Sequence, residues 1–418
     1  MKETTRSWRD VAQSYSLAFD SKKMVFAFAG ALLTFLWVWA SANVYAALGG
    51  PYTGMDELCQ PRLYRWLTVS GAAEGAYQLL PLLNPFCADL LHAVCSIVFL
   101  AGLFAIWAYF GGAITRLAVL EYGKDELPSL GEGVSYARDR FVAFAFTPLA
   151  PLIGMIAMAL CLIVLGLLGR IPYLGPVCLG LGHVAAPFLG LAIVFIAVYG
   201  VVSFGLMFPA VSADGKDAFE GWSRAYGYLI WSPGRFFGYS ALALVVGIIS
   251  CAVVALFGEA LICATVTCVN FGLGGAEGWI EYDWGHYYRS LTSFFGGGRP
   301  ALDVAMDVRV DEGGRAVAAN AAVFAFMIVR GLVAGYAIAY YFCANSIIYL
   351  LLRRDVDRID IDAIYDPEGV EELGKETRLP PEREPAVAAK DTDAEAEQAP
   401  SPPASEEEET NVEEDKEE

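Results

Sequence analysis

The stretch DAFEGWSRAYGYLIWSPGRFF, from Asp217 to Phe237, combines a short amphipathic pattern with the start of a long apolar run. Its apolar residues recur every three or four positions and therefore share one helical face. They are Phe219, Trp222, Tyr226, Leu229 and Ile230. Asp217 with Glu220 three residues later resembles a capping box, and Pro233-Gly234 ends the pattern. We therefore expect a short surface helix that leads directly into a membrane span.

The same pattern occurs twice more, each time before an apolar run. SLGEGVSYARDRFVAF has Ser129 and Glu132 at the cap spacing, and SWRDVAQSYSLAFDSKKMVF has Ser7 and Asp10. The chain is thus expected to hold three copies of one unit, a surface helix followed by two spans, at about 7–114, 129–208 and 217–352. Because each copy contains two spans, the copies share one orientation and are parallel repeats.

The composition predicts an all-α polytopic membrane protein. Of the 418 residues 56% are hydrophobic, and the mean hydropathy is +0.47. Several apolar runs exceed the roughly 20 residues needed to cross a bilayer core. The six expected spans are Met24–Leu48, Leu90–Ile114, Phe141–Leu168, Val184–Phe208, Phe236–Phe257 and Gly331–Leu352. The apolar core of the first span is too long for a signal peptide, so we expect it to remain uncleaved.

The segment 258–330 allows more than one interpretation. The apolar run continues after Phe257 as ALICATVTCVNFGLGG, which fits a further span or a re-entrant segment. Val317–Val329 fits either the start of a long final helix or a separate surface helix. An even number of spans keeps both ends of the chain on one side, and we expect six.

The distribution of Lys and Arg sets the orientation. One set of segments between spans carries 15 of them and the alternate set carries 7, which predicts that both termini are cytoplasmic. The net charge of -19 belongs mostly to residues 366–418, which hold 20 acidic and 5 basic residues. We expect 1–365 to form the membrane domain and 366–418 to be a disordered acidic tail. Such a tail either solubilises the protein or binds a basic cytoplasmic protein.

The three surface helices are expected to contact the lipid bilayer. Trp and Tyr are enriched at the depth of the lipid headgroups, and an apolar helix face is stable there. The expected interface residues are Trp8, Tyr15, Phe19, Phe219, Trp222, Tyr226 and Leu229. The alternative is that these helices pack onto the cytoplasmic ends of the spans.

Two stretches resemble a known kind of protein. AFEGWSRAYGYLIWSPGRFFGYSALAL and IIYLLLRRDVDRIDIDAIY resemble uncharacterised bacterial polytopic inner-membrane proteins, among them the membrane domain attached to some glycerophosphodiester phosphodiesterases. The resemblance is one of layout and covers about two thirds of the chain. It implies a multi-pass protein of the bacterial inner membrane, brings no catalytic residues, and does not extend to the hydrolase of those proteins.

One segment offers candidate metal ligands. In EGWIEYDWGHYYRS the side chains of Glu281, Asp283 and His286 are of the types that bind a divalent ion. No recognised ligand spacing accompanies them. The many Trp and Tyr residues of the same segment favour an aromatic belt at the outer interface instead.

Cys59 and Cys87 both fall in the first outer loop, where a disulfide between them is chemically allowed. Two reduced thiols are the alternative, since Cys95 and Cys178 compete as partners.

Glu259, Arg330 and Asn345 are the polar residues of the apolar regions that could line a solute path. Glu259 and Arg330 also lie at predicted span ends, where they could reach the interface. We favour this second interpretation for the two charged residues.

The sequence lacks a phosphate-binding loop and a nucleophile elbow. We therefore expect a non-enzymatic membrane protein without cofactors or nucleic-acid partners, which organises or stabilises a complex of other membrane proteins or the envelope. The alternative is a transporter or channel for a small or lipid-like solute. In that case Pro148 and Pro151 would break the third span.

Overall fold

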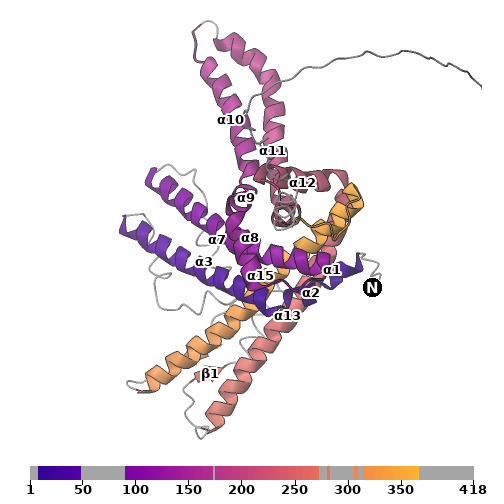
Figure 1. The fold of residues 1–418 in the computed structure, drawn as a ribbon. Coiled ribbons are helices and arrows are strands. Elements are labelled where there is room, and N and C mark those ends of the chain that lie inside the picture. The colour runs from indigo at the N-terminus through magenta and orange to yellow at the C-terminus, as the bar shows by residue number, and fades with distance from the viewer. Residues whose placement is uncertain are drawn as a thin grey trace, which may run out of the picture. The chain divides into compact units, whose positions relative to one another are not determined.

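The computed structural model describes residues 8–48, 90–172, 175–272, 280–282, 306–308 and 314–366 (Figure 1). The helices are α1 (Arg9–Ala12), α2 (Ser14–Ala18), α3 (Ser21–Ala47), α7 (Leu90–Lys124), α8 (Leu130–Asp139), α9 (Phe141–Phe146), α10 (Ala150–Leu168), α11 (Gly175–Asp214), α12 (Ala218–Trp231), α13 (Pro233–Gly272) and α15 (Gly314–Asp357). Two three-residue strands, β1 (Ile280–Tyr282) and β2 (Met306–Val308), pair antiparallel with Glu281 opposite Asp307. The described part of the chain is all-α apart from this ribbon.

Six of the described helices are long and apolar enough to cross a membrane, which confirms the predicted polytopic fold. They are α3, α7, α10, α11, α13 and α15. Residues 258–272 continue α13, and residues 314–330 begin α15. Apart from β1 and β2, the described part of the segment 258–330 thus extends the last two span helices. At 40 and 44 residues, α13 and α15 are about 60 and 66 Å long, roughly twice the thickness of a bilayer core.

The third predicted span is not one helix. A turn at 147–149 separates α9 from α10, because Pro148 and Pro151 have no backbone N–H to donate to the preceding turn. Pro187 and Pro209, by contrast, lie inside α11, which continues past both. The break that the proline pair predicts is therefore present, and the third span helix begins at Ala150 instead of at the predicted Phe141.

α15 is the central helix, since it packs against α3, α7, α11 and α13. Half of its most apolar window is buried, compared with 6% in α10. Its contact with α3 is close at the sequence GLVAG, where Gly331 and Gly335 fall one turn apart. A Cβ atom on Gly335 would lie 3.2 Å from the carbonyl oxygen of Met24 and from the amide nitrogen of Phe28. Glycine permits this approach of two backbones, as in other membrane helix pairs.

The six span helices also pack in pairs, α3 with α7, α10 with α11, and α13 with α15. Each pair follows one or two short helices, so the order of elements agrees with the predicted unit of a surface helix and two spans. A three-dimensional repeat among the three units stays a prediction.

The two predicted caps within the described residues differ in outcome. The Ser129 hydroxyl accepts a hydrogen bond from the Glu132 backbone N–H at 3.2 Å, as the capping pattern predicts. Asp217 occupies the N-cap position of α12, but its side chain makes no capping hydrogen bond. The cap predicted there is wrong in this respect.

The short helices bury a different set of side chains from the one expected. In α1 and α2 the exposed aromatic residues are Trp8, Tyr15 and Phe19, while Val11 and Leu17 are buried. This face of α1 and α2 packs on α13 and α15. The three aromatic side chains thus remain exposed, and their contact with lipid stays a prediction.

In α12 the outcome is mixed. Phe219 is exposed and Trp222 is half-buried, but Tyr226 and Leu229 are buried in the protein. The Tyr226 hydroxyl donates a hydrogen bond to the carbonyl oxygen of Ile196 on α11. The expectation that Tyr226 and Leu229 face lipid is therefore wrong, because they pack the helix onto the spans.

Candidate functional site

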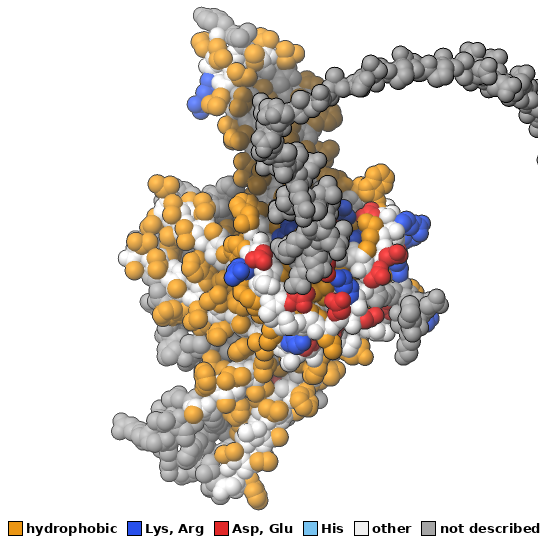
Figure 2. Space-filling view, in the orientation of Figure 1, with side chains coloured by type: hydrophobic (Ala, Val, Ile, Leu, Met, Phe, Trp, Pro, Cys, Tyr) orange, Lys and Arg blue, Asp and Glu red, His pale blue; other side chains and the backbone are white. Residues whose placement is uncertain are grey.

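The described charged residues gather mostly at one end of the span helices, which we call the charged end. Figure 2 shows most of the blue and red side chains in one area, with orange hydrophobic surface around it. At its centre is Asp214, the last residue of α11, whose side chain is 4% exposed. Its carboxylate lies 3.0 Å from Nε of Arg353 and 3.1 Å from a guanidinium nitrogen of Arg224, and it accepts a hydrogen bond from the Tyr349 hydroxyl. Three helices are thus joined at one carboxylate.

A second carboxylate extends this network. The Tyr228 hydroxyl donates to Asp357 at 2.6 Å, and Arg224 lies 3.8 Å from the same carboxylate. Burial, together with the charges of Asp357 and Asp214, raises the pKa of Tyr228, so its hydroxyl remains a donor. Burial lowers the pKa of Arg224, but Asp214, the two tyrosines Tyr349 and Tyr228 and the hydrogen bond to Glu220 together outweigh it, so the net pKa is raised. Both shifts keep Tyr228 neutral and Arg224 charged at neutral pH.

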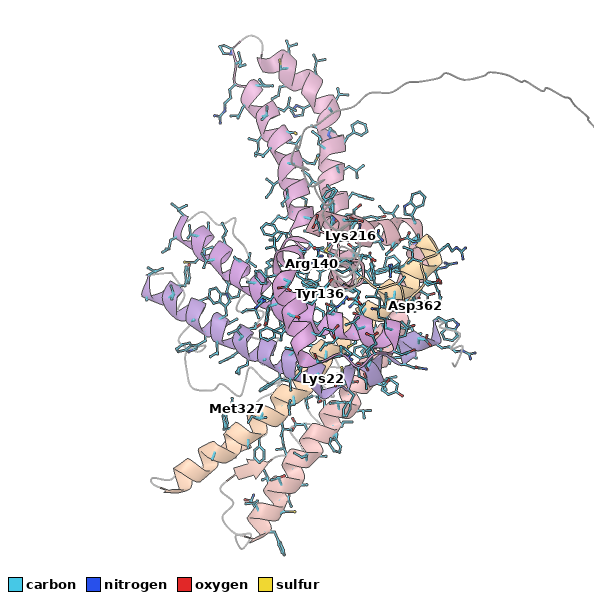
Figure 3. The ribbon with its side chains drawn as sticks, in the orientation of Figure 1. Lys22, Tyr136, Arg140, Lys216, Met327 and Asp362 are labelled. Atoms are coloured by element: carbon cyan, nitrogen blue, oxygen red, sulfur yellow. The ribbon has the colours of Figure 1, made fainter. Side chains whose placement is uncertain are left out.

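Arg116 of α7 is buried beside Tyr136 of α8. Its guanidinium carbon lies 4.2 Å from the centre of the Tyr136 ring, and it donates hydrogen bonds to the carbonyl oxygens of Ser212 and Tyr365 at 3.0 and 2.9 Å. Burial raises the pKa of Tyr136 to about 12, although the charge of Arg116 opposes the shift. Figure 3 labels Tyr136 and Arg140 in this region. The cation is thus bound by carbonyl oxygens and an aromatic face.

Residues 358–366, which we call the C-terminal strap, lie against the charged end. Ile361 and Ile364 are buried, and a Cβ on Gly123 of α7 would meet both. The Tyr365 backbone N–H donates to the Ala213 carbonyl at 2.9 Å, and the Arg353 guanidinium donates to the Ala363 carbonyl at 2.7 Å. The strap therefore connects the ends of α7, α11 and α15.

Most charged side chains of the charged end bind another charged group or a backbone carbonyl oxygen. The charged end therefore offers few groups for catalysis or ligand binding. Lys23, whose side chain is fully buried, is bound by Glu121 and by the Leu17 carbonyl, which ties α3 to α7. Among the described residues, no group of His, Cys, Asp and Glu is arranged to hold a metal ion. We take this end to position helices.

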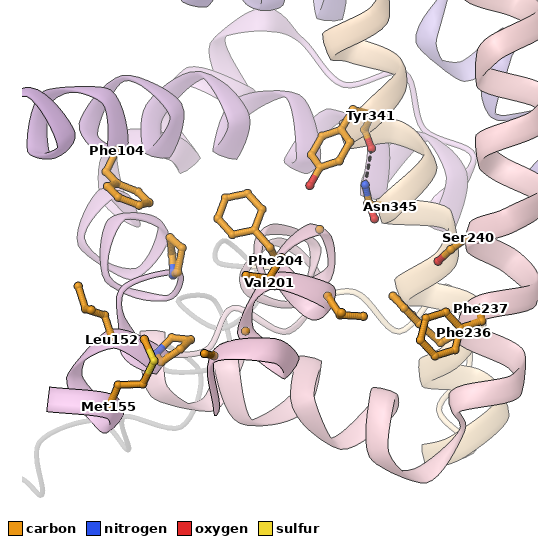
Figure 4. Close-up of a pocket in the computed structure, with 16 residues that line it drawn as sticks. Phe104, Leu152, Met155, Val201, Phe204, Phe236, Phe237, Ser240, Tyr341 and Asn345 are labelled. Carbon is orange, nitrogen blue, oxygen red and sulfur yellow. Dashed lines mark hydrogen bonds between the residues drawn. The ribbon is translucent and has the colours of Figure 1, made fainter. Parts of the chain in front are cut away.

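A pocket of about 700 Å³ lies between the span helices, within the size range of ligand sites (Figure 4). Residues of α7, α10, α11, α13 and α15 line it, together with the turn at 147–149. Several lining side chains are largely exposed, Val201 at 79% and Phe237 at 56%, so the pocket is open. Pro148 and Pro151 belong to its wall, and none of its lining residues is charged. The pocket is therefore suited to an apolar ligand.

Three polar side chains enter this apolar wall from α13 and α15. They are Ser240, Tyr341 and Asn345, which Figure 4 shows on the same side of the pocket, opposite Leu152 and Met155. The Asn345 amide nitrogen donates to the Tyr341 carbonyl at 2.8 Å. Among the described residues, no hydrogen-bond partner is present for the Asn345 amide oxygen or for the Ser240 and Tyr341 hydroxyls. These three oxygens are the polar groups that the pocket presents.

The predicted path residues do not converge on the pocket. Asn345 lines it, but Glu259 and Arg330 lie farther along α13 and α15. They form a two-point ion pair, with nitrogen-oxygen distances of 3.0 and 3.1 Å and side-chain exposures of 16% and 9%. Each charge is thus neutralised by the other, and a path that joins the pair to Asn345 stays a prediction. The pair lies within two continuous helices that are longer than a bilayer core is thick, so its predicted place at span ends stays a prediction.

The remaining predicted site residues fall outside the described residues. Only the backbone of Glu281 is described, in β1, while Asp283, His286, Cys59 and Cys87 are not. The metal and disulfide hypotheses thus stay predictions. Cys95 and Cys178, named as competing partners, are free thiols in the structure.

Comparison with protein-family models, curated proteins and solved structures finds no match to this chain. The resemblance to inner-membrane domains therefore stays a prediction.

Two features of the structure are not among the predictions from the sequence. GLVAG, at Gly331 to Gly335, is a glycine pair in an apolar run, a recognised signal for close helix packing. The strap carried a weaker signal, the alternation of Ile361 and Ile364 with acidic residues directly after the last span.

Proposed function

We propose that this chain is a non-enzymatic multi-pass membrane protein that organises or stabilises a complex of membrane proteins. The charged end supports this proposal, because its ions pair with one another and fix the ends of four span helices. The α10–α11 hairpin extends away from the charged end, and its sides are broadly apolar and exposed, for example at Ile163 and Leu191. Of the residues in α10, only Pro151 is buried. This rigid attachment of an exposed apolar hairpin carries the proposal.

Photo-crosslinking tests this function. A photoreactive residue at Leu191, which is 66% exposed on α11, is expected to give discrete protein adducts in native membranes. The same residue at Ala210, which is fully buried on α11, is the control and should give none. If photoreactive residues at Leu191 and at Ile163 of α10 give lipid adducts and no protein adducts, the proposal is contradicted.

The orientation belongs to the same proposal, with the charged end in the cytoplasm of a bacterial cell. Its high content of Lys and Arg supports this placement. Reporter fusions after Lys216 and Arg354 should report the inside, and a fusion after Arg170 the outside. A signal from outside at Lys216 would contradict the placement. The acidic tail then extends into the cytoplasm, where a basic protein is its proposed partner.

The pocket favours a second candidate function, the movement of a lipid-like solute. Its wall is uncharged and open, and the proline break at 147–149 lets α10 and α11 enclose one side of it. Loss of solute movement between the leaflets of proteoliposomes on blocking the pocket with Val201→Trp would support this function. If the solute moves between the leaflets equally fast in liposomes without the protein, this function is refuted.

A further inference from the structure

We propose that the pocket binds an uncharged amphiphile, a long apolar chain with a hydroxyl or carbonyl head, through Ser240, Tyr341 and Asn345. The inference rests on the second candidate function and names its ligand. Binding and movement are separable, so each can fail alone.

The unpartnered oxygens supply the first argument. An oxygen without a hydrogen bond in an apolar medium loses several kcal/mol relative to water. In α-helices a serine hydroxyl commonly bonds to a carbonyl of the preceding turn, as those of Ser203 and Ser346 do here. Ser240 makes no such bond among the described residues. The three oxygens therefore favour a ligand that brings hydrogen-bonding groups to this wall.

The depth of these oxygens supplies the second argument. Asn345 is eight residues from Arg353 along α15, and Tyr341 is twelve. At 1.5 Å per residue they lie about 12 and 18 Å from the charged end, within a hydrocarbon core about 30 Å thick. The basic residue nearest to the third oxygen, that of Ser240, is Arg235, about 8 Å away along α13, and its guanidinium lies 3.4 Å from the Asp355 carboxylate. A phosphate beside Asn345 and Tyr341 would lose its hydration without a free cation among the described residues to replace it. An uncharged head has no such cost.

The shape of the pocket supplies the third argument. The apolar wall opposite the polar oxygens includes Leu152, Met155 and Phe204, which suit an acyl or isoprenoid chain. Val201 and Phe237 are exposed at its mouth, so a chain can enter from the lipid phase. The pocket thus separates a small polar wall from a larger apolar one, as an amphiphile does.

Binding of radiolabelled dioleoylglycerol to the full-length protein in phosphatidylcholine nanodiscs tests the proposal. Saturable binding is expected, competed by unlabelled dioleoylglycerol and at least about tenfold less by dioleoylphosphatidic acid, which has the same chains and a charged head. Geranylgeraniol as a second competitor distinguishes an isoprenoid alcohol from a glycerolipid. Equal competition by phosphatidic acid, or binding that does not saturate, would overturn the proposal.

Variants locate the site. Tyr341→Phe and Ser240→Ala each remove one oxygen and should weaken binding about fivefold, and Asn345→Leu about tenfold. Val201→Trp should fill the pocket and abolish binding, whereas Val198→Trp, on the same helix but outside the pocket wall, should leave it unchanged. Melting temperatures confirm that each variant is folded. Unchanged affinity in all three polar variants would overturn the proposal even if the lipid binds.

The outcomes for binding and movement are distinct. Binding as described without movement between leaflets keeps the site and removes the second candidate function. Movement that survives Val201→Trp removes the site and keeps the function.

Discussion

Replacing Glu259 by glutamine would leave the Arg330 guanidinium charged beside an uncharged partner in the packing between α13 and α15. In the structure this cation is 9% exposed and donates two hydrogen bonds to the carboxylate. The residues that follow Glu259 in α13 are apolar for most of another three turns. Water therefore has limited access to replace the lost carboxylate.

The expected loss follows from this geometry. Breaking a buried ion pair by removing one partner costs about 3–5 kcal/mol. Because both side chains keep some exposure, we expect the lower part of this range, about 3 kcal/mol, for Glu259→Gln and for Arg330→Gln. Replacing both residues, by Glu259→Leu with Arg330→Met, should bring the stability close to that of the original protein, since no charge is then left without a partner.

Unfolding in mixed micelles with increasing SDS, followed by circular dichroism, gives the free energy of unfolding of each variant. The double variant Glu259→Gln with Arg330→Gln should lose about 3–4 kcal/mol, little more than either single variant, because the charge left alone in the first change is removed by the second. The cycle of these three variants should therefore show a coupling energy of about 2–3 kcal/mol. Glu220→Gln is the control, because that carboxylate is 42% exposed and pairs with Arg224 on the surface. Its replacement should cost less than about 1 kcal/mol.

Equal effects of Glu259→Gln and Glu220→Gln would refute this reasoning. So would a coupling energy below about 0.5 kcal/mol, the limit of additivity for independent sites. Either result would place the Glu259–Arg330 pair in contact with water, as for residues that reach the interface from a span end.

Three further predictions follow from the packing. Gly335→Leu should separate α15 from α3 and lower the free energy of unfolding by about 3 kcal/mol or more, whereas Gly166→Leu, with open space around it, should change it little. Truncation after Pro367 should leave the melting temperature unchanged, while truncation after Asp357 also removes the two buried isoleucines of the strap and should cost about 3–5 kcal/mol. The pKa of Tyr136 is raised to about 12, from about 10 in the unfolded chain. Its contribution to stability is therefore constant below pH 10 and is lost between pH 10 and 12, at about 1.4 kcal/mol per pH unit, and Tyr136→Phe should remove this loss from a pH titration of unfolding.

The sequence could predict the elements whose signals are local. Apolar runs of sufficient length located all six span helices, and the serine cap at Ser129 located α8. The faces of the short helices could not be predicted in the same way. An apolar face is equally compatible with lipid and with protein, and only the placement of α11 shows that Tyr226 faces protein.

The candidate site was harder to predict because its parts are distant in the chain. Pro148, Pro151 and Asn345 had been singled out, each for its own reason, and the fold brings them to one pocket. Glu259 and Arg330 had been singled out too, but nothing in their spacing showed that they pair across 71 positions. Polar residues in apolar runs can thus be recognised from sequence, while their partners depend on helix packing.

The central position of α15 has a consequence for how the protein is made. Among the described helices α15 is the last to leave the ribosome, yet α3, α7, α11 and α13 all pack against it. These earlier helices must enter the membrane and remain there without α15, the helix against which they later pack. Assembly at the centre therefore cannot begin until α15 has been made, and a ribosome that stalls ahead of Gly314 would release an incomplete set of helices for degradation.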